Sequence, residues 1–448
     1  MPESLTSHGV RRQGDGASLW RLTYPLVVGN LAQIALTVAD GVVLGRFSTE
    51  AVAAVGLAST VVIVATMLST GWATATQVLV ARRHGSGESE GADSATDVGV
   101  AFGLAVGAVI GALVAALAGP LARLMAGEGS LATEAAGYLR IAAAGLPLAG
   151  AMAALRSGLA ARGRTKVTMR AAIIVNVVNV PLDVALVYGL GWGARGAAAG
   201  TVLALAVTVA VLGRHTWRRA DGGRRPIALA RWRAEIPHVV RIGWPETVML
   251  ASGYFTSVLL GSIVAGLGVS ELAAWAVLAR VLPVLWTVIY ACSTGIAVAV
   301  GQRLGAGDGD GALAVIRAGW ALTGGLAGLI VVPVLVAPGL VLGAFTTDAD
   351  VLGGATAARV ALFGQAPLMV ATMVYTGALR AAGDTKSIMV AGTAASYLVS
   401  LPASWFLATQ TRLGLPGLFL GQFGYWAVRL WLIRRRYRGG AWLASEPA

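Results

Sequence analysis

The chain is built from repeated blocks of apolar residues, each long enough to cross a lipid bilayer as a helix. A membrane-spanning helix needs about 20 consecutive, mostly apolar residues. Charged or glycine-rich stretches separate twelve such blocks in the 448-residue sequence. We therefore predict twelve transmembrane helices, at 20–45, 52–80, 97–119, 134–156, 167–190, 195–213, 240–265, 272–300, 314–337, 354–378, 387–408 and 415–436.

The composition excludes several classes of protein. Hydrophobic residues make up 56% of the chain and charged residues 12%, whereas soluble proteins carry about 25% charged residues. An ordinary soluble enzyme or a DNA-binding domain is therefore excluded. The sequence has no GxxxxGK[ST] phosphate loop, which excludes ATP hydrolysis by that route. The single cysteine, Cys292, lies inside an apolar block and cannot form a disulfide framework or a thiol-ligand metal cluster. We expect an all-α membrane protein, neither an enzyme nor the carrier of a cofactor.

Positive charges gather before the first block and after the even-numbered blocks. Lysine and arginine are retained on the cytoplasmic side of a membrane, so both termini are expected in the cytoplasm. The net charge of +13 then reflects topology rather than nucleic-acid binding, which is the disfavoured alternative for the most basic loop. The predicted domains are a cytoplasmic tail (1–18), a six-helix N-lobe (19–213), a basic cytoplasmic linker (214–238), a six-helix C-lobe (239–437) and a second cytoplasmic tail (438–448).

The two halves of the sequence align at a constant offset of 220 residues. The segment VARRHGSGESEGA (80–92) matches VGQRLGAGDGDGA (300–312), and ARGRTKVTM (161–169) matches AAGDTKSIM (381–389). An even number of helices per half gives both halves the same orientation, as in transporters whose substrate path lies between two lobes. Pro25 lies inside the first long block and is a candidate hinge, since proline removes a backbone hydrogen bond. A static kink is the alternative.

Two of the predicted helices carry a polar stripe along one face. A carboxylate in the middle of a membrane helix costs roughly 2.5–3.5 kcal/mol, so such a stripe must face protein or water. Residues spaced by three and four share one helix face. The stripes consist of Asn30, Gln33, Thr37 and Asp40 in the first helix, and of Asn176, Asn179 and Asp183 in the fifth.

The internal repeat provides a control for these stripes. The corresponding positions of the second half are Leu250, Gly253, Ser257, Leu260, Ser396, Val399 and Ala403. The scaffold therefore does not require the two aspartates. We expect Asp40 and Asp183 to form an ion switch, since two buried carboxyls can share a proton and oxygen-rich cages also hold Na⁺. The alternatives are a hydrogen-bonded pair that only stabilises the lobe, or a solvated Asp183 near a helix end.

The C-terminal half carries charges of its own. Glu246 follows Pro245, and we expect it at the start of the seventh helix in a helix-start or interfacial role. Arg280 lies well inside the eighth predicted helix and needs a partner or a wet cavity. A structural role is expected for Arg280; pairing with Glu246 is one arrangement, although no spacing argument requires it.

These features resemble the MATE (multidrug and toxic compound extrusion) transporters. The resemblance rests on the six-plus-six helices, the glycine-rich loops after the second and eighth helices, the ARGRTK and AAGDTK segments, and Pro25 with Asp40 in the first helix. Asp40 followed by Asn179, Asp183 and Thr201 looks like the DinF-type branch. The resemblance implies a MATE-type fold, coupling carboxylates at Asp40 and Asp183, and supporting ligands at Asn179 and Thr201. It also places Gln33 on the substrate cavity; Asn30, Thr37 and Asn176 are further cavity candidates.

The sequence departs from the NorM-type branch in its second half. That branch carries a glutamate well inside the seventh helix and an aspartate in the tenth, whereas 354–378 contains no acidic residue. Coupling is therefore expected in the N-lobe. The resemblance implies a monomeric H⁺- or Na⁺-coupled antiporter of the bacterial inner membrane that expels small amphipathic, often cationic compounds. The alternatives are a flippase for lipid-linked saccharides, for which Arg280 is the main argument, and a passive channel or scaffold.

Overall fold

The computed structural model describes residues 15–217 and 229–443, and every element within these ranges is helical. The first half contains α1 (Asp15–Gly45), α2 (Thr49–Thr70), α3 (Ala73–Gly85), α4 (Ser89–Ala126), α5 (Ser130–Ala161), α6 (Thr165–Val184), η1 (Ala185–Gly189) and α7 (Gly193–Trp217). The second half contains α8 (Leu229–Ala265), α9 (Val269–Gly305), α10 (Gly309–Val336), α11 (Pro338–Leu342), α12 (Ala349–Phe363), α13 (Ala366–Ala381), α14 (Thr385–Ala394), η2 (Ala395–Ser400), α15 (Leu401–Thr409) and α16 (Gly414–Arg438).

Apart from the short α11, the helices of the described residues combine into twelve helical rods, as the apolar blocks predict. Ten helices in the described part of the chain are long and apolar enough to cross a membrane, and the bent pair α12 and α13 makes an eleventh. Helix α16 is the twelfth rod, 25 residues long and arginine-rich at its end. Several rods exceed the predicted ranges: α4 covers 89–126 rather than 97–119. Helical hydrogen bonding continues through polar residues beyond the apolar block, which hydropathy alone does not detect.

Continuation of the helices beyond their apolar blocks also shortens the segment that we expected to be a basic linker. Helix α7 continues to Trp217 and α8 begins at Leu229, both within 214–238. Residues 218–228 of this segment lie outside the described residues, as do 1–14 and 444–448 of the two tails.

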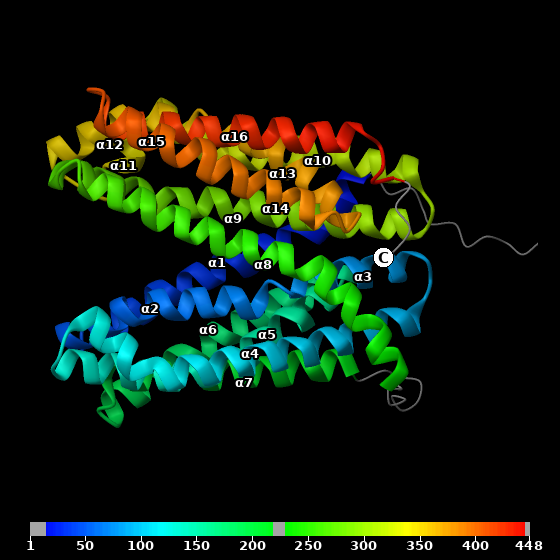
Figure 1. Cartoon of the computed structure of the whole chain (residues 1–448), viewed down its shortest axis with the longest axis horizontal. Helices are drawn as coiled ribbons and strands as arrows, with labels where there is room; N and C mark the ends of the chain where they lie inside the picture. The colour runs from blue at the N-terminus through cyan, green and yellow to red at the C-terminus, as the bar shows by residue number, and fades with distance from the viewer. Residues whose placement is uncertain (1–14, 218–228, 444–448) are drawn as a thin grey trace, which may run out of the picture.

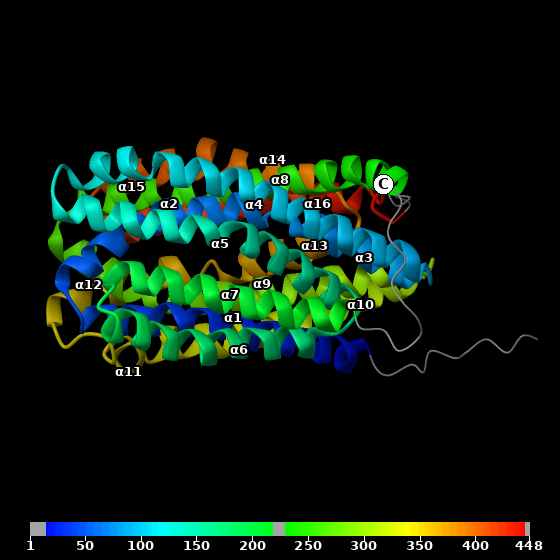
Figure 2. The same ribbon diagram turned by 90° about the horizontal axis from the view of Figure 1, so that it is seen from below.

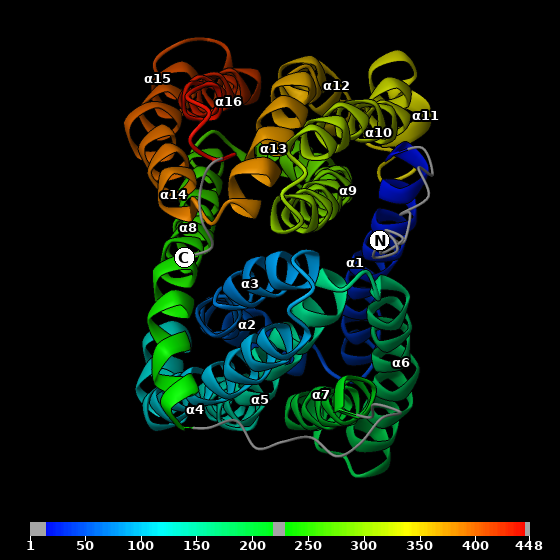
Figure 3. The same ribbon diagram turned by 90° about the vertical axis from the view of Figure 1, so that its right-hand side faces the viewer.

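The two halves form two lobes that are joined by two crossing helices (Figures 1 and 3). The long helices run along nearly the same direction (Figure 2). Helix α1 packs against α6 in its own half and against α9 and α10 in the other half. Helix α8 packs in the same way against α14 of its own half and against α2 and α3 of the other. Each lobe is thus connected to the other by its first helix.

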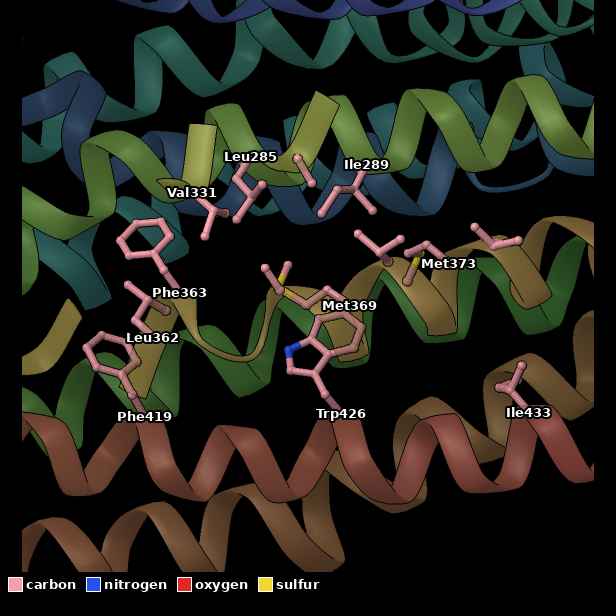
Figure 4. Packing of buried hydrophobic residues seen from close by; sticks show 14 of the residues in the cluster. Leu285, Ile289, Val331, Leu362, Phe363, Met369, Met373, Phe419, Trp426 and Ile433 are labelled. Atoms are coloured by element: carbon pink, nitrogen blue, oxygen red, sulfur yellow. The ribbon is translucent and has the colours of Figure 1, made fainter. Parts of the chain in front are cut away.

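A large apolar core holds the C-terminal half together (Figure 4). Side chains from α9, α10, α12, α13 and α16 meet in it, and Trp426 of α16 points toward Met369 of α13. Burying apolar area does not by itself associate helices in lipid, so close packing must add to their cohesion. In the N-terminal half the glycines of α4 provide it: a Cβ on Gly107 would lie 2.5 Å from the carbonyl oxygen of Leu146 in α5.

The lobes meet tightly at one end of the molecule, which we call the basic end because α3 finishes there with Arg82, Arg83 and His84. Among the interlobe hydrogen bonds there, Arg82 Nε donates to the carbonyl oxygen of Ala381 at 3.0 Å, and Gln302 Nε2 donates to that of Ala161 at 2.7 Å. These four positions are related by the 220-residue offset. The contacts between the lobes therefore follow the repeat that the sequence predicts.

Candidate functional site

The four residues expected to form the ion site come together in the N-terminal half. Asp40 lies on α1, Asn179 and Asp183 on α6, and Thr201 on α7. The carboxyl groups of Asp40 and Asp183 are close enough to interact directly with each other. Asn179 and Asp183 are fully buried, while Asp40 and Thr201 are half-buried. Helix packing of α6 against α1 and α7 thus assembles the cluster from residues up to 161 positions apart.

The amide of Asn179 connects two members of this cluster. Its Nδ2 lies 3.3 Å from Asp183 Oδ1, one helical turn away, and 3.5 Å from Thr201 Oγ1. The Thr201 hydroxyl donates its own proton to the carbonyl oxygen of Ala197 at 3.0 Å. The threonine oxygen is therefore oriented as an acceptor toward the cluster.

Three buried oxygen atoms of the cluster have no hydrogen-bond donor among the described residues: Asp40 Oδ1, Asp183 Oδ2 and Asn179 Oδ1. Buried acceptors of this kind normally have a partner, and burial without one is costly. A proton or a cation with oxygen ligands would satisfy them. The described residues contain no group of three His, Cys, Asp or Glu side chains able to hold a metal, so a bound Na⁺ would depend on amide and hydroxyl oxygens as well.

Two neighbours of the cluster escaped the sequence analysis. Tyr138 on α5 lies close enough to both aspartates to interact with them electrostatically, yet a tyrosine in an apolar helix gives no periodic signal. Gly200 on α7 has a role that only coordinates reveal, because a Cβ at this position would lie 2.0 Å from Asp183 Oδ1. Glycine at 200 therefore allows α7 to approach the carboxyl closely.

The remaining polar residues do not extend the cluster. Asn30 accepts a hydrogen bond from Arg156 Nη2 at 3.5 Å. Asn176 donates to its own helix, at the carbonyl oxygen of Ala172. Gln33 and Thr37 are exposed, and neither lines the two cavities described below. Contact between Gln33 and substrate therefore stays a prediction.

The expectations for the charges of the second half need correction. Glu246 lies well inside α8 rather than at a helix start, because α8 begins at Leu229. Its Oε1 lies 2.6 Å from Arg380 Nη2, and both side chains are about 1–2% exposed. Arg280 is exposed, with its guanidinium 6.0 Å from the ring centroid of Phe345. Arg280 therefore does not pair with Glu246.

Two cavities adjoin between the lobes, since both are lined by Leu250 and Tyr290. The smaller, of about 310 Å³, includes Asn30 and Arg156 in its wall. The larger, of about 600 Å³, lies mainly in the C-terminal half and is called here the C-lobe cavity. Its wall includes Leu250, Gly253, Ser257, Leu260 and Ser396, which are the repeat counterparts of Asn30, Gln33, Thr37, Asp40 and Asn176.

Comparison with known proteins agrees with this architecture. The MatE family model matches the chain twice, over residues 25–185 and 245–406. A probable multidrug resistance protein NorM from Bradyrhizobium diazoefficiens is 30% identical over 90% of this chain and 88% of its own length. The multidrug resistance protein PmpM from Pseudomonas aeruginosa is 28% identical over 94% of this chain and 90% of its own length.

Solved structures show the same fold. A MOP superfamily transporter from Pyrococcus furiosus, described as having a binding pocket of reverse polarity, aligns with a TM-score of 0.84 at 22% identity, over 97% of this chain and 99% of its own. An outward-facing multidrug resistance MATE family transporter aligns with a TM-score of 0.83 over the same shares, also at 22% identity. With the twelve helical rods and the family match in each half, the chain belongs to the MATE family of multi-pass membrane transporters.

Proposed function

We propose that this transporter is an ion-coupled multidrug exporter whose coupling site is the Asp40–Asp183 pair. The observation that carries the proposal is the contact between these two carboxyl groups, of which that of Asp183 is fully buried. One oxygen atom of each carboxyl group and the amide oxygen of Asn179 have no donor among the described residues. The names of the relatives, multidrug resistance proteins NorM and PmpM, support the export of small molecules. The DinF-type identity of the ion site remains part of this proposal.

A proton is the coupling ion that the geometry favours. Two ionised carboxylates in contact repel each other and can only accept hydrogen bonds, so one proton shared between Asp40 and Asp183 would stabilise the pair. Na⁺ is the alternative, with Asp40, Asp183, Asn179 and Thr201 as ligands. The experiment below distinguishes the two ions.

The structure offers a route from the ion site to the lobe interface. Asp40 lies on α1, which also packs against α9 and α10 of the other lobe. Loss or gain of charge at Asp40 changes the packing of α1 on α6, and α1 passes that change to the second lobe. Pro25, inside α1, is the proposed hinge. Alternating access then consists of opening the basic end while the opposite end closes.

The proposed orientation follows the positive charges. The basic end faces the cytoplasm of a bacterial cell, and the protein lies in the inner membrane with both termini inside, as a monomer. The tight interlobe contacts at the basic end then close the cytoplasmic side. The state described here is therefore proposed to be open toward the outside.

Transport measurements in proteoliposomes test the coupling. Wild-type protein, Asp40→Asn and Asp183→Asn are compared under an imposed pH gradient and then an Na⁺ gradient. Asp350→Asn, an exposed acid in the first turn of α12, is the matched control. We expect both cluster variants to lose gradient-driven drug movement while the control retains it. Uphill transport by either cluster variant would refute the assignment, and transport independent of both gradients would indicate a passive channel.

The charge of the transported compound is a separate question. The expected preference for cations came from the family resemblance, and neither Asp40 nor Asp183 lines the described interlobe cavities. We therefore propose amphipathic small molecules without requiring a positive charge. Arg280 no longer supports the flippase alternative, because it is exposed. Arg156 and Arg429 do line the cavities and keep that alternative open. Drug movement without lipid-linked saccharide movement in the same vesicles distinguishes exporter from flippase.

A further inference from the structure

The C-lobe cavity has the size and lining of a site for an aromatic small molecule. Its volume of about 600 Å³ lies within the range of ligand pockets, about 300–1,000 Å³. Aromatic side chains from three helices form much of the wall: Tyr254, Trp275, Trp286, Tyr290, Tyr425 and Trp426. Such surfaces bury planar hydrophobic bodies well.

One charged group in this wall lacks a counter-charge. Arg429 of α16 is 3% exposed. Its Nη1 donates to the Tyr425 hydroxyl at 2.6 Å, and its Nη2 lies 3.7 Å from the Met249 sulfur. Its Nε has no acceptor within 15–217 and 229–443. Among the described residues no carboxylate forms an ion pair with Arg429, although a buried guanidinium normally has one.

The other arginine of the cavity is already neutralised. Arg380 forms the buried ion pair with Glu246 at 2.6 Å, and no acidic side chain is among the described residues that line the cavity. The cavity therefore carries one net positive charge, located at Arg429. The rings of Tyr425 and Trp426, both 5.6 Å from its guanidinium carbon, offset only part of the cost of burying it.

We infer that the C-lobe cavity binds an amphipathic compound with an aromatic body and an anionic group, and that Arg429 receives the anion. A guanidinium matches a carboxylate with two parallel hydrogen bonds, and here Nε lacks an acceptor. The aromatic wall contacts the apolar body. The inference specifies the substrate of the proposed exporter and so rests on that function, but binding can be measured without any ion gradient.

Three probes that share one ring system test the preference for an anion. They are 2-naphthaleneacetate, its neutral amide and 2-(2-naphthyl)ethylammonium, titrated by calorimetry against the full chain in phosphatidylcholine nanodiscs. Because hydrogen bonds between charged groups are the strong ones, we expect the acetate to bind about ten- to a hundredfold more tightly than the amide. The ammonium compound should bind most weakly. Equal affinities for the three probes would overturn the inference.

Substitution of the arginine tests its role. Arg429→Gln should bind the acetate and the amide within about twofold of each other, while Arg429→Lys retains part of the preference. Arg435→Gln is the matched control, since Arg435 is an exposed residue of the same helix outside the cavity lining. A preference that persists in Arg429→Gln would refute the assignment. If Arg429→Gln does not yield monodisperse protein, the three probes on wild type and Arg429→Lys decide alone.

An anionic lipid headgroup has the same chemistry, and a second arm of the experiment identifies it. Nanodiscs with added phosphatidylglycerol are compared with phosphatidylcholine alone. An unchanged affinity for the acetate supports a free small molecule as the occupant. A weaker affinity in wild type but not in Arg429→Gln supports the anion site and makes lipid its occupant. Failure of the pH-gradient experiment would leave each of these binding results intact, so the two proposals are tested separately.

Discussion

The closure of the basic end depends on two glycines, which gives a quantitative prediction. A Cβ on Gly85 of α3 would lie 2.0 Å from the carbonyl oxygen of Gln302 in α9, and a Cβ on Gly305 of α9 would lie 2.0 Å from that of Arg82 in α3. Non-bonded Cβ atoms do not come closer to a backbone oxygen than about 3.0 Å. Each alanine substitution therefore requires the two helices to move apart by about 1 Å.

The magnitude follows from the cost of overpacking. Adding a methyl group to a closely packed contact costs typically 1–3 kcal/mol. In the proposed alternating-access cycle only the closed state of the basic end contains this contact, so Gly85→Ala should shift the closed-to-open ratio by about 5- to 150-fold toward open. Gly305→Ala should act in the same direction. The effects of the two need not add, because the residues share one interface.

Thiol accessibility measures this shift. Ala160, in the wall of the smaller cavity, is replaced by cysteine in a Cys292→Ala background and labelled with a membrane-impermeant reagent applied to either side of the membrane. Gly85→Ala should accelerate labelling from the cytoplasmic side. Gly324→Ala is the control, since a Cβ there meets no atom within 4 Å. A labelling rate equal to that of the control would show that this contact does not hold the end closed.

Three further predictions concern other contacts. A Cβ on Gly301 would lie 3.1 Å from the Cβ of Ala81, which is close to the separation in a disulfide. Cysteines at these two positions should therefore cross-link under oxidation and stop transport until reductant is added. Glu246→Gln should lower stability by about 3–5 kcal/mol because it leaves the charge of Arg380 buried without a partner. In thermal unfolding, the double variant with Arg380→Met should recover much of this loss. Additive effects of the two substitutions on stability would contradict the pairing. A backbone amide and a neighbouring arginine lower the pKa of Asp308. The ionised carboxylate therefore stabilises the fold above its ordinary pKa near 4, and this effect is lost as the pH falls through the lowered pKa. The difference in melting temperature between wild type and Asp308→Ala should shrink in acid and stay constant near neutrality.

The sequence predicted the twelve rods and the repeat because both depend on local pattern. Apolar blocks and basic loops are read residue by residue, and the 220-residue offset reappears in the paired contacts of Arg82 and Gln302. Helical spacing placed Asp40 and Asp183 each on the polar face of its own helix, and the family resemblance implied that the two form one site.

The pairing of Glu246 could not be predicted in this way. Its partner, Arg380, lies 134 residues away on α13, and the sequence placed that arginine in a loop after the tenth helix. Arg156 was the last residue of the predicted helix 134–156, whereas α5 continues to Ala161 and holds Arg156 inside the helix. Hydropathy ends a predicted helix at its first charges, whereas the real helix continues and carries those charges into a cavity. An error of a few residues at the end of a predicted helix thus led to a wrong prediction of the role of a charged side chain.

The internal repeat shows at which positions the two lobes differ. The positions of Asn30, Gln33, Thr37 and Asp40 in the first lobe correspond to wall residues of the C-lobe cavity in the second. One lobe therefore has acidic and amide groups at a location where the other has an open, aromatic and positively charged space. Ion and compound consequently need not compete for the same atoms. In the proposed cycle, proton binding at Asp40 affects the compound only through the movement of α1 against the second lobe. A variant of Arg429 should therefore alter which compounds bind while leaving proton binding at the aspartates unchanged.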